Sequence, residues 1–282
     1  MAKKRKDTKI LIIAKQNKLG IRLAKKLEKQ LKPFTDEIYF DRSTSLRAGM
    51  RGTSVKKFDG DIIITIGGDG TLLWTSQQIE KPVPILPVKI EGHGFLCTTT
   101  YKELSQNVRR IFTKDYKVVE RTRIKCSKGT LGLIEKFFHK EYPLALNEIV
   151  FARKRPSKIL EIEFKLDGVP FLFRGDGLMF STPSGSTAYN ASAGGPIIDA
   201  SLDIISIVPL YPFYSRIKSF VIPPKKVEVT VKNGECSVIM DGHGGEYVKP
   251  NTTFIIEKGS PLKVVILNEQ NTYQKVKSEF FI

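Results

Sequence analysis

A change of pattern along the chain constrains the fold more than any single motif does. Up to residue 112, apolar runs such as 9–14 and 61–66 alternate with helix-like segments, of which 19–32 has apolar residues at helical spacing. Strand–helix–strand alternation is typical of a parallel sheet covered by helices. From Lys117 onward, short β-rich runs follow one another between turn residues, which predicts a second, all-β unit.

The same pattern locates the remaining elements of the first half. We expect strands at 36–40 and 83–90 and helices at 71–79 and 101–112. The stretch 42–57 is polar and contains two glycines. We interpret it as a mobile loop, because such composition between periodic segments is typical of loops.

Two domains follow from this pattern. We predict an α/β domain over residues 1–114 and a β-rich domain over residues 115–262. The last segment, 263–282, is expected to return to the N-terminal domain, with a short helix near 271–281.

The chain is strongly basic, with 46 Lys and Arg residues against 29 Asp and Glu residues and a net charge of +17. Such a charge is compatible with nucleic-acid binding through phosphate neutralisation. The basic residues are spread along the whole chain, however, and neither zinc-finger spacing nor an aromatic–basic motif is present. We therefore favour a solvated, lysine-rich surface and expect no nucleic-acid partner.

Hydropathy and the spacing of the cysteines and histidines exclude further classes of protein. No apolar run reaches the roughly 18 residues that a membrane span requires. The three cysteines and three histidines are dispersed, a spacing that suggests neither a disulfide framework nor a zinc site. We expect a cytoplasmic protein without a membrane partner.

A glycine-rich turn follows the predicted strand 61–66 and contains Gly67, Gly68 and Gly70. Glycine lets a ligand approach the backbone closely, and the unpartnered N–H groups at the start of the next helix favour an anion. Thr71 adds a hydroxyl donor. The turn is neither a P-loop, which needs a lysine before Thr71, nor a dinucleotide fingerprint, which needs a third glycine where Leu73 stands.

Asp69 is the unusual residue of this turn. A carboxylate beside a bound phosphate repels it unless a cation intervenes or the carboxylate removes a proton. Both conditions are met in phosphoryl transfer to an alcohol. Alternatively, Asp69 caps the following helix, because aspartate is a common N-cap residue. The turn alone leaves both interpretations open.

A second segment, "RGDGLMFSTPSGSTAYNASAGGPII" over 174–198, is more specific. It combines glycines, hydroxyls and one tyrosine without hydrophobic periodicity. Its backbone N–H groups and hydroxyls suit a ligand with ribose, amide and phosphate groups. A Ser/Gly linker is the alternative, but Tyr189 and the Thr182-Pro183 pair argue against low complexity.

Together, "GGDGT" (67–71), "NE" (147–148), "DG…STPSGSTAY…SAGGP" (176–196) and "DGH" (241–243) resemble the NAD kinases in order and spacing. The resemblance implies an enzyme that phosphorylates the 2′-hydroxyl of the adenosine ribose of NAD to give NADP. It also implies ATP or polyphosphate as the donor and Mg²⁺ or another divalent cation as cofactor. The implied fold is a Rossmann-like N-terminal domain with a C-terminal β-sandwich, and the implied assembly is a homodimer or homotetramer.

The resemblance also assigns roles to individual positions. Asp69 is similar to the catalytic aspartate near the accepting hydroxyl, and Gly67, Gly68, Gly70 and Thr71 are similar to the phosphate-binding turn. The positions similar to NAD-binding residues are Phe95, Asn147, Glu148, Asp176, Ser184, Thr187, Ala188, Tyr189 and Asp241. The segment 89–99 departs from the family pattern because it lacks the usual asparagine.

Two other classes remain as alternatives. A lipid or sugar kinase that shares only the glycine turn leaves the segment 176–196 unexplained. A non-catalytic protein that binds nucleotides or nucleic acid predicts no phosphate transfer. An assay that offers NAD, a sugar phosphate and diacylglycerol distinguishes these possibilities.

Overall fold

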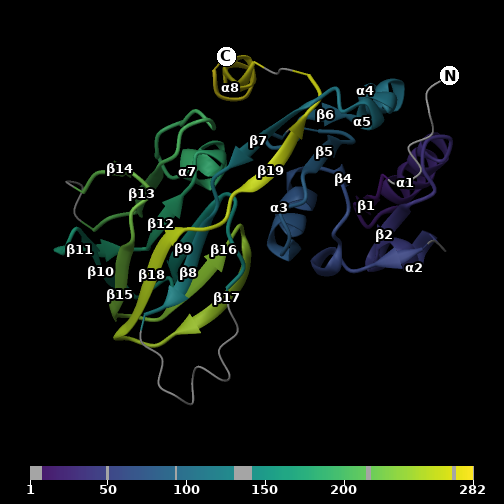
Figure 1. Cartoon of the computed structure of the whole chain (residues 1–282). Helices are drawn as coiled ribbons and strands as arrows, with labels where there is room; N and C mark the ends of the chain where they lie inside the picture. Colours follow the sequence, from purple (N-terminus) through teal and green to yellow (C-terminus); the bar gives the residue numbers. More distant parts are fainter. Residues whose placement is uncertain are drawn as a thin grey trace. The chain divides into compact units, whose positions relative to one another are not determined.

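A largely parallel sheet organises the N-terminal part of the computed structural model, which describes residues 8–48, 51–92, 94–129, 142–213, 217–268 and 271–281. Its strand order is β3-β2-β1-β4-β5-β19-β7, with β6 paired to β5 (Figure 1). The strands are β1 (Ile10–Ala14), β2 (Ile38–Asp41), β3 (Gly52–Thr53), β4 (Ile62–Gly67), β5 (Ile85–Lys89), β6 (Thr99–Thr100), β7 (Lys117–Arg121) and β19 (Leu262–Ile266). Strands β1 to β6 pair in parallel, and β19 runs parallel to β5.

The order of the first five strands is that of a Rossmann-like sheet, so the predicted α/β class of the N-terminal domain is confirmed. In this order the connections reverse direction between β1 and β4. Ligands of open α/β sheets bind beyond the carboxyl ends of the strands at such a switch point. The glycine turn leaves the carboxyl end of β4 and therefore lies at this position.

Helices connect the strands of this sheet, and one further helix, α8, follows the last strand, β19. They are α1 (Lys18–Leu31), α2 (Arg42–Ala48), η1 (Val55–Lys57), α3 (Asp69–Gln78), α4 (Tyr101–Asn107), α5 (Arg109–Thr113) and α8 (Thr272–Phe280). Helix α1 buries Ala24, Leu27 and Leu31 and presents its lysines on the other face, as its spacing predicts. The predicted helix 101–112 is two helices, which meet at Val108.

The prediction of a loop at 42–57 is wrong, because α2, β3 and η1 occupy most of that stretch. Asp41 explains the difference. Its carboxylate accepts hydrogen bonds from the backbone N–H of Ser43, 3.0 Å away, and from the hydroxyls of Ser43 and Thr44. A carboxylate at a helix start satisfies otherwise unpartnered donors, so a Ser/Thr-rich stretch that looks like a loop forms a helix here.

The chain divides into two units. One contains Met1–Glu120 and Leu262–Ile282, and the other contains Arg121–Pro261. Strand β7 belongs to the N-terminal sheet next to β19, although its sequence resembles the short β runs that follow it.

Two antiparallel sheets form the second unit, in the orders β11-β10-β15-β18-β8 and β14-β13-β12-β9-β16-β17 (Figure 1). The strands are β8 (Ile124–Lys128), β9 (Glu148–Arg153), β10 (Leu160–Leu166), β11 (Val169–Gly175), β12 (Gly177–Ser181), β13 (Ile205–Leu210), β14 (Phe220–Ile222), β15 (Val227–Asn233), β16 (Cys236–Met240), β17 (His243–Val248) and β18 (Thr252–Lys258). The predicted β-rich class of this unit is confirmed.

One apolar core lies between these sheets. Phe164 and Val229 come from the first sheet, and Phe151 and Phe180 come from the second. On the other face of the second sheet, Met179 and its neighbours pack against the segment that follows β12. That segment contains η2 (Ser184–Thr187) and α7 (Tyr189–Ser192). Because both of its faces are covered, β12 is buried along its whole length.

Candidate functional site

The predicted site residues fall into two groups, one in each unit. The first group surrounds the glycine turn between β4 and α3. A Cβ atom on Gly67 would lie 2.1 Å from the hydroxyl oxygen of Thr71, so only glycine lets the Thr71 side chain fold back against the strand end. Among the residues that the structure describes, a Cβ on Gly68 or Gly70 would meet no heavy atom within 4 Å. The backbone of the turn is therefore open to an approaching group.

Asp69 does not cap helix α3, so the capping alternative is wrong. The N-cap residue is Gly68, and Asp69 is the first residue of the helix. Its Oδ2 accepts the backbone N–H of Phe95 at 2.8 Å, and its Oδ1 accepts that of Leu96 at 3.2 Å. The carboxylate thus joins the glycine turn to the segment that follows β5.

Close packing supports this junction. A Cβ on Gly94 would lie 2.7 Å from Oδ1 of Asp69, so any larger residue there displaces the carboxylate or the segment. Cys97 is buried, and burial raises the pKa of its thiol to about 12, with the charge of Asp69 and a hydrogen bond to it adding to the effect. The thiol is therefore protonated at neutral pH and acts as a neutral neighbour of Asp69.

Phe95 is half-buried, and its ring stacks on that of Phe280 in α8 with the ring centroids 5.7 Å apart. The predicted assignment of Phe95 to an NAD-binding position stays a prediction. The contact does show that the C-terminal helix covers this segment.

The second group is organised by Asp241, which is 4% exposed. Its Oδ1 accepts the N–H groups of Asn147 and Glu148 at 2.7 and 3.1 Å, and its Oδ2 accepts that of Leu146 at 2.9 Å. The carboxylate holds the backbone of 146–148 in a fixed turn before β9. Asp241 itself has a positive φ of 49°, a conformation that aspartate tolerates better than most residues.

The side chains of Asn147 and Glu148 are buried, each at 6% exposure. Among the described residues, Oδ1 of Asn147 and Oε2 of Glu148 have no hydrogen-bond partner. Burying a polar atom without a partner is costly, so these atoms indicate a place for a ligand or water. Burial raises the pKa of Glu148 to about 7, and the charge of Asp241 adds to this shift.

The hydroxyl-rich segment lies against the same turn. Thr182 donates its hydroxyl to the carbonyl of Leu146 and accepts the N–H of Gly185. A Cβ on Gly185 would lie 2.2 Å from the carbonyl oxygen of Asn147. Ser184 is buried and directly precedes Gly185, so it lies in the part of the segment that packs against Asn147.

The remaining predicted residues lie farther along. Thr187 and Ala188 are half-buried, and the Tyr189 side chain is 46% exposed. Asp176 precedes β12, whereas Glu148 pairs with Ser181 at the other end of that strand. At about 3.3 Å per residue, Asp176 is roughly 16 Å from this pair. Its Oδ2 is 2.8 Å from Nη2 of Arg153.

Sequence reasoning missed residues that hold these loops. Asn190 is buried and donates from Nδ2 to the carbonyl oxygens of Ser186 and Pro196, 3.1 and 2.8 Å away. Arg123 is buried near Asp241 and donates to Ser260. Burial lowers the pKa of Arg123 to about 10, and the charge of Asp241 opposes that shift. A buried arginine has no local signature in the sequence.

A divalent cation has no dedicated site within the described part of the chain, where no three His, Cys, Asp or Glu side chains are placed to hold one. Mg²⁺ is commonly bound by one or two carboxylates together with substrate phosphates. Asp69 is the carboxylate at the glycine turn. The residues therefore fit a cation that arrives with a phosphate donor better than a resident metal.

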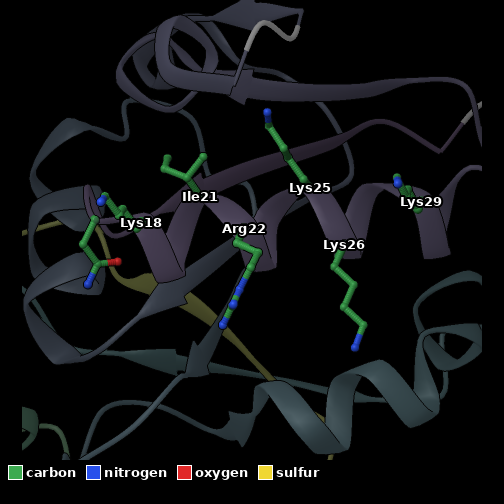
Figure 2. A pocket seen from close by; sticks show the side chains of 7 residues that line it. Lys18, Ile21, Arg22, Lys25, Lys26 and Lys29 are labelled. Atoms are coloured by element: carbon green, nitrogen blue, oxygen red, sulfur yellow. The ribbon is translucent and has the colours of Figure 1, made fainter.

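A hollow of about 690 Å³ lies elsewhere, along α1. Figure 2 shows its basic side chains, with Arg22 and Lys26 pointing to one side of the helix and Lys25 to the other. It contains none of the predicted site residues. As for membranes, none of the described helices is long and apolar enough to span one.

The fold and these two groups define a protein with an α/β unit and an all-β unit, the first with an open glycine turn and the second with a turn that buries unpartnered polar atoms. Family comparison agrees with this class. Residues 10–116 match the ATP-NAD kinase N-terminal domain, and residues 146–267 match the ATP-NAD kinase C-terminal domain. The chain belongs to the NAD kinase family, as the motifs predicted.

Individual relatives support the assignment. The NAD kinase of Methanothermobacter thermautotrophicus is 33% identical over 81% of this chain and 79% of its own length. That of Thermococcus kodakarensis is 31% identical over 95% and 99%. The family assignment favours an NAD kinase over the lipid or sugar kinase and the non-catalytic alternatives.

Solved structures show the same fold. Yeast NADH kinase complexed with NADH aligns over 98% of this chain and 88% of its own, with a TM-score of 0.85 and 17% identity. An NAD kinase from Archaeoglobus fulgidus in complex with ATP aligns over 96% and 99%, with a TM-score of 0.76 and 25% identity.

Proposed function

We propose that this chain transfers the terminal phosphate of ATP to the 2′-hydroxyl of the adenosine ribose of NAD, giving NADP and ADP. The observation that carries the proposal is the pair of buried, unpartnered oxygens on Asn147 and Glu148 beside the hydroxyl-rich segment. Adenine offers N–H donors and ribose offers O–H donors, and either kind of donor satisfies such acceptor oxygens. The family assignment identifies the ligand class.

Asp69 supplies the base in this proposal. Each oxygen of its carboxylate accepts one backbone N–H, and the thiol of Cys97 adds a third hydrogen bond, which leaves one of the roughly four acceptor positions of the carboxylate. The carboxylate is thus fixed in orientation and still able to accept the proton of the ribose hydroxyl. Proton transfer to a positioned side chain contributes about 10²- to 10⁴-fold to rates of this kind.

The glycine turn binds the donor phosphates. The open backbone at Gly68 and Gly70 and the hydroxyl of Thr71 present donors at the start of α3, where the helix dipole favours an anion. A divalent cation bound to ATP neutralises charge on the transferring group.

The other predicted residues complete the proposed acceptor site. Asp241 acts through the backbone of 146–148, because its carboxylate oxygens already accept three N–H groups. Ser184, Thr187, Ala188 and Tyr189 form the loop beside the adenosine. Asp176 lies at the far end of β12, a separation that suits the other end of an extended dinucleotide.

The proposal is tested by incubating the purified chain with NAD, ATP and Mg²⁺ and measuring NADP with an NADP-specific dehydrogenase. Parallel reactions contain polyphosphate in place of ATP, NADH in place of NAD, or EDTA in place of Mg²⁺. A sugar phosphate and diacylglycerol serve as control acceptors. We expect NADP in the complete reaction and none with EDTA. The absence of phosphorylated dinucleotide with every donor and acceptor contradicts the proposal.

The cytoplasmic location stays a prediction from hydropathy, and the homodimer or homotetramer stays a prediction from the family resemblance. Light scattering coupled to size-exclusion chromatography measures the assembly directly.

A further inference from the structure

The C-terminal helix α8 contacts the segment that follows β5 at two points. Lys275 donates from Nζ to the backbone carbonyl of Cys97, 3.1 Å away. Phe280 stacks on Phe95, with the ring planes 29° apart. The helix start is fixed by Asn271, whose side chain accepts two backbone N–H groups of its first turn.

The segment held by α8 is the one that holds Asp69. Phe95 and Leu96, which donate their N–H groups to the two oxygens of Asp69, directly precede Cys97. A shift of this short segment moves both donors. The ammonium of Lys275 is thus linked to the carboxylate through one carbonyl and two adjacent peptide groups.

Charge adds a second link. Lys275 is half-buried, and burial lowers the pKa of its ammonium, whereas the charge of Asp69 opposes that shift. The groups that also act on it are Cys97, Lys89 and Glu279. Lys89 is the last residue of β5 and pairs in register with Gly67, the first glycine of the turn. Two cations, Lys89 and Lys275, are therefore close to the glycine turn.

We infer that Lys275 is a positioning residue for the proposed phosphoryl transfer, which fixes the carboxylate of Asp69 by holding the carbonyl of Cys97 and the two amides before it. The inference rests on the proposed function for its effect on turnover. The link from Lys275 to Asp69 itself rests on the contacts of the N-terminal unit alone.

The first test compares Lys275→Met, Lys275→Arg and Lys277→Met. Lys277 is an exposed lysine on the same helix and serves as the matched control. We expect Lys275→Met to lower kcat about 10- to 100-fold with the KM for NAD changed less than about 2-fold, because displacing a reacting group by about 1 Å has effects of this size. Lys275→Arg, which keeps a charged donor, restores most of the turnover, and Lys277→Met behaves as the parent.

The second test uses hydrogen exchange of the amides of Phe95 and Leu96 and needs no enzymatic activity. Lys275→Met is expected to accelerate their exchange at unchanged midpoint of thermal unfolding, and Lys277→Met is not. Unchanged exchange in Lys275→Met overturns the inference. So does unchanged kcat, an equal loss of kcat in Lys277→Met, or no recovery in Lys275→Arg. If the parent makes no NADP but the amides still exchange faster in Lys275→Met than in the parent, the proposed function is contradicted. The link from Lys275 to Asp69 is then still supported.

Discussion

Two aspartates, one in each unit, both accept backbone N–H groups with their carboxylates but differ in their expected roles. Asp69 accepts two backbone N–H groups and Asp241 accepts three, in each case from a segment distant in the sequence. Asp241 is buried, whereas Asp69 is half-exposed at the start of a helix.

The two carboxylates differ in how many of their acceptor positions are occupied by backbone N–H groups and how many remain for a reacting group. Asp241 is surrounded by protein and shapes a turn that presents Asn147 and Glu148. Asp69 is oriented by the backbone but stays half-exposed. The comparison predicts that Asp69 matters most for turnover and Asp241 most for stability.

Replacing Asp69 by Asn tests the catalytic half of this comparison. We expect kcat to fall about 10³-fold, since an amide cannot accept the hydroxyl proton, while the affinity for NAD stays within about 3-fold. Steady-state kinetics and calorimetric titration with NAD measure the two quantities. Asp59→Asn, at an exposed carboxylate paired with Lys81, is the control. Turnover near that of the parent would remove Asp69 from the mechanism.

Replacing Asp241 by Asn tests the structural half. One amide oxygen cannot accept all three buried N–H groups, and a nearby buried arginine loses its counter-charge. The free energy of unfolding should fall by about 3 kcal/mol, as measured by urea denaturation. Asp167→Asn is a close control, because Asp167 is exposed and also has positive φ, at 50°. Equal losses in both variants would show that backbone conformation, not the hydrogen bonds, sets the cost.

The sequence predicts the placement of the glycine turn but not the partners of its aspartate. An apolar strand followed by glycines places Asp69 at the carboxyl edge of a parallel sheet. Its donors lie 26 and 27 residues later, in a segment without periodicity. Lys275 lies 178 residues from the carbonyl it contacts and is one of 46 Lys and Arg residues. Such pairings arise from tertiary packing, which local patterns do not encode.

The burial of the second group also escapes local reasoning. Glu148 opens a strand, where a carboxylate is ordinarily exposed. It is buried because Asp241, 93 residues away, fixes the backbone of the preceding turn. The prediction of a loop at 42–57 is wrong because local composition was misleading there. A single carboxylate, that of Asp41, stabilises the start of a helix made of polar residues.

Two glycine substitutions sharpen the comparison by disturbing each group separately. Gly94→Ala places a methyl group against Asp69, and Gly185→Ala places one against the backbone of Asn147. We expect Gly94→Ala to lower kcat about 10- to 100-fold. Gly185→Ala should instead raise the KM for NAD, about 10-fold, because it displaces the nucleoside-binding turn. The same kinetic change in both variants would contradict the division of roles.

The pH dependence of stability tests the buried carboxyl of the second group, that of Glu148. The pKa of Glu148 is raised to about 7 from an ordinary value of 4.5, so the folded chain binds this proton more tightly than the unfolded chain. The contribution of Glu148 to stability is therefore present below about pH 4.5 and is lost as pH rises to about 7.

The variant Glu148→Gln removes this titration. Relative to the parent, we expect the variant to gain about 2–3 kcal/mol between pH 5 and pH 8, as measured by urea denaturation at both values. Glu163→Gln, at a half-buried carboxyl in β10, is the control. An equal pH dependence in Glu148→Gln and the parent would mean that Glu148 is ionised in the folded chain, and that its unpartnered oxygen carries a charge for the ligand to meet.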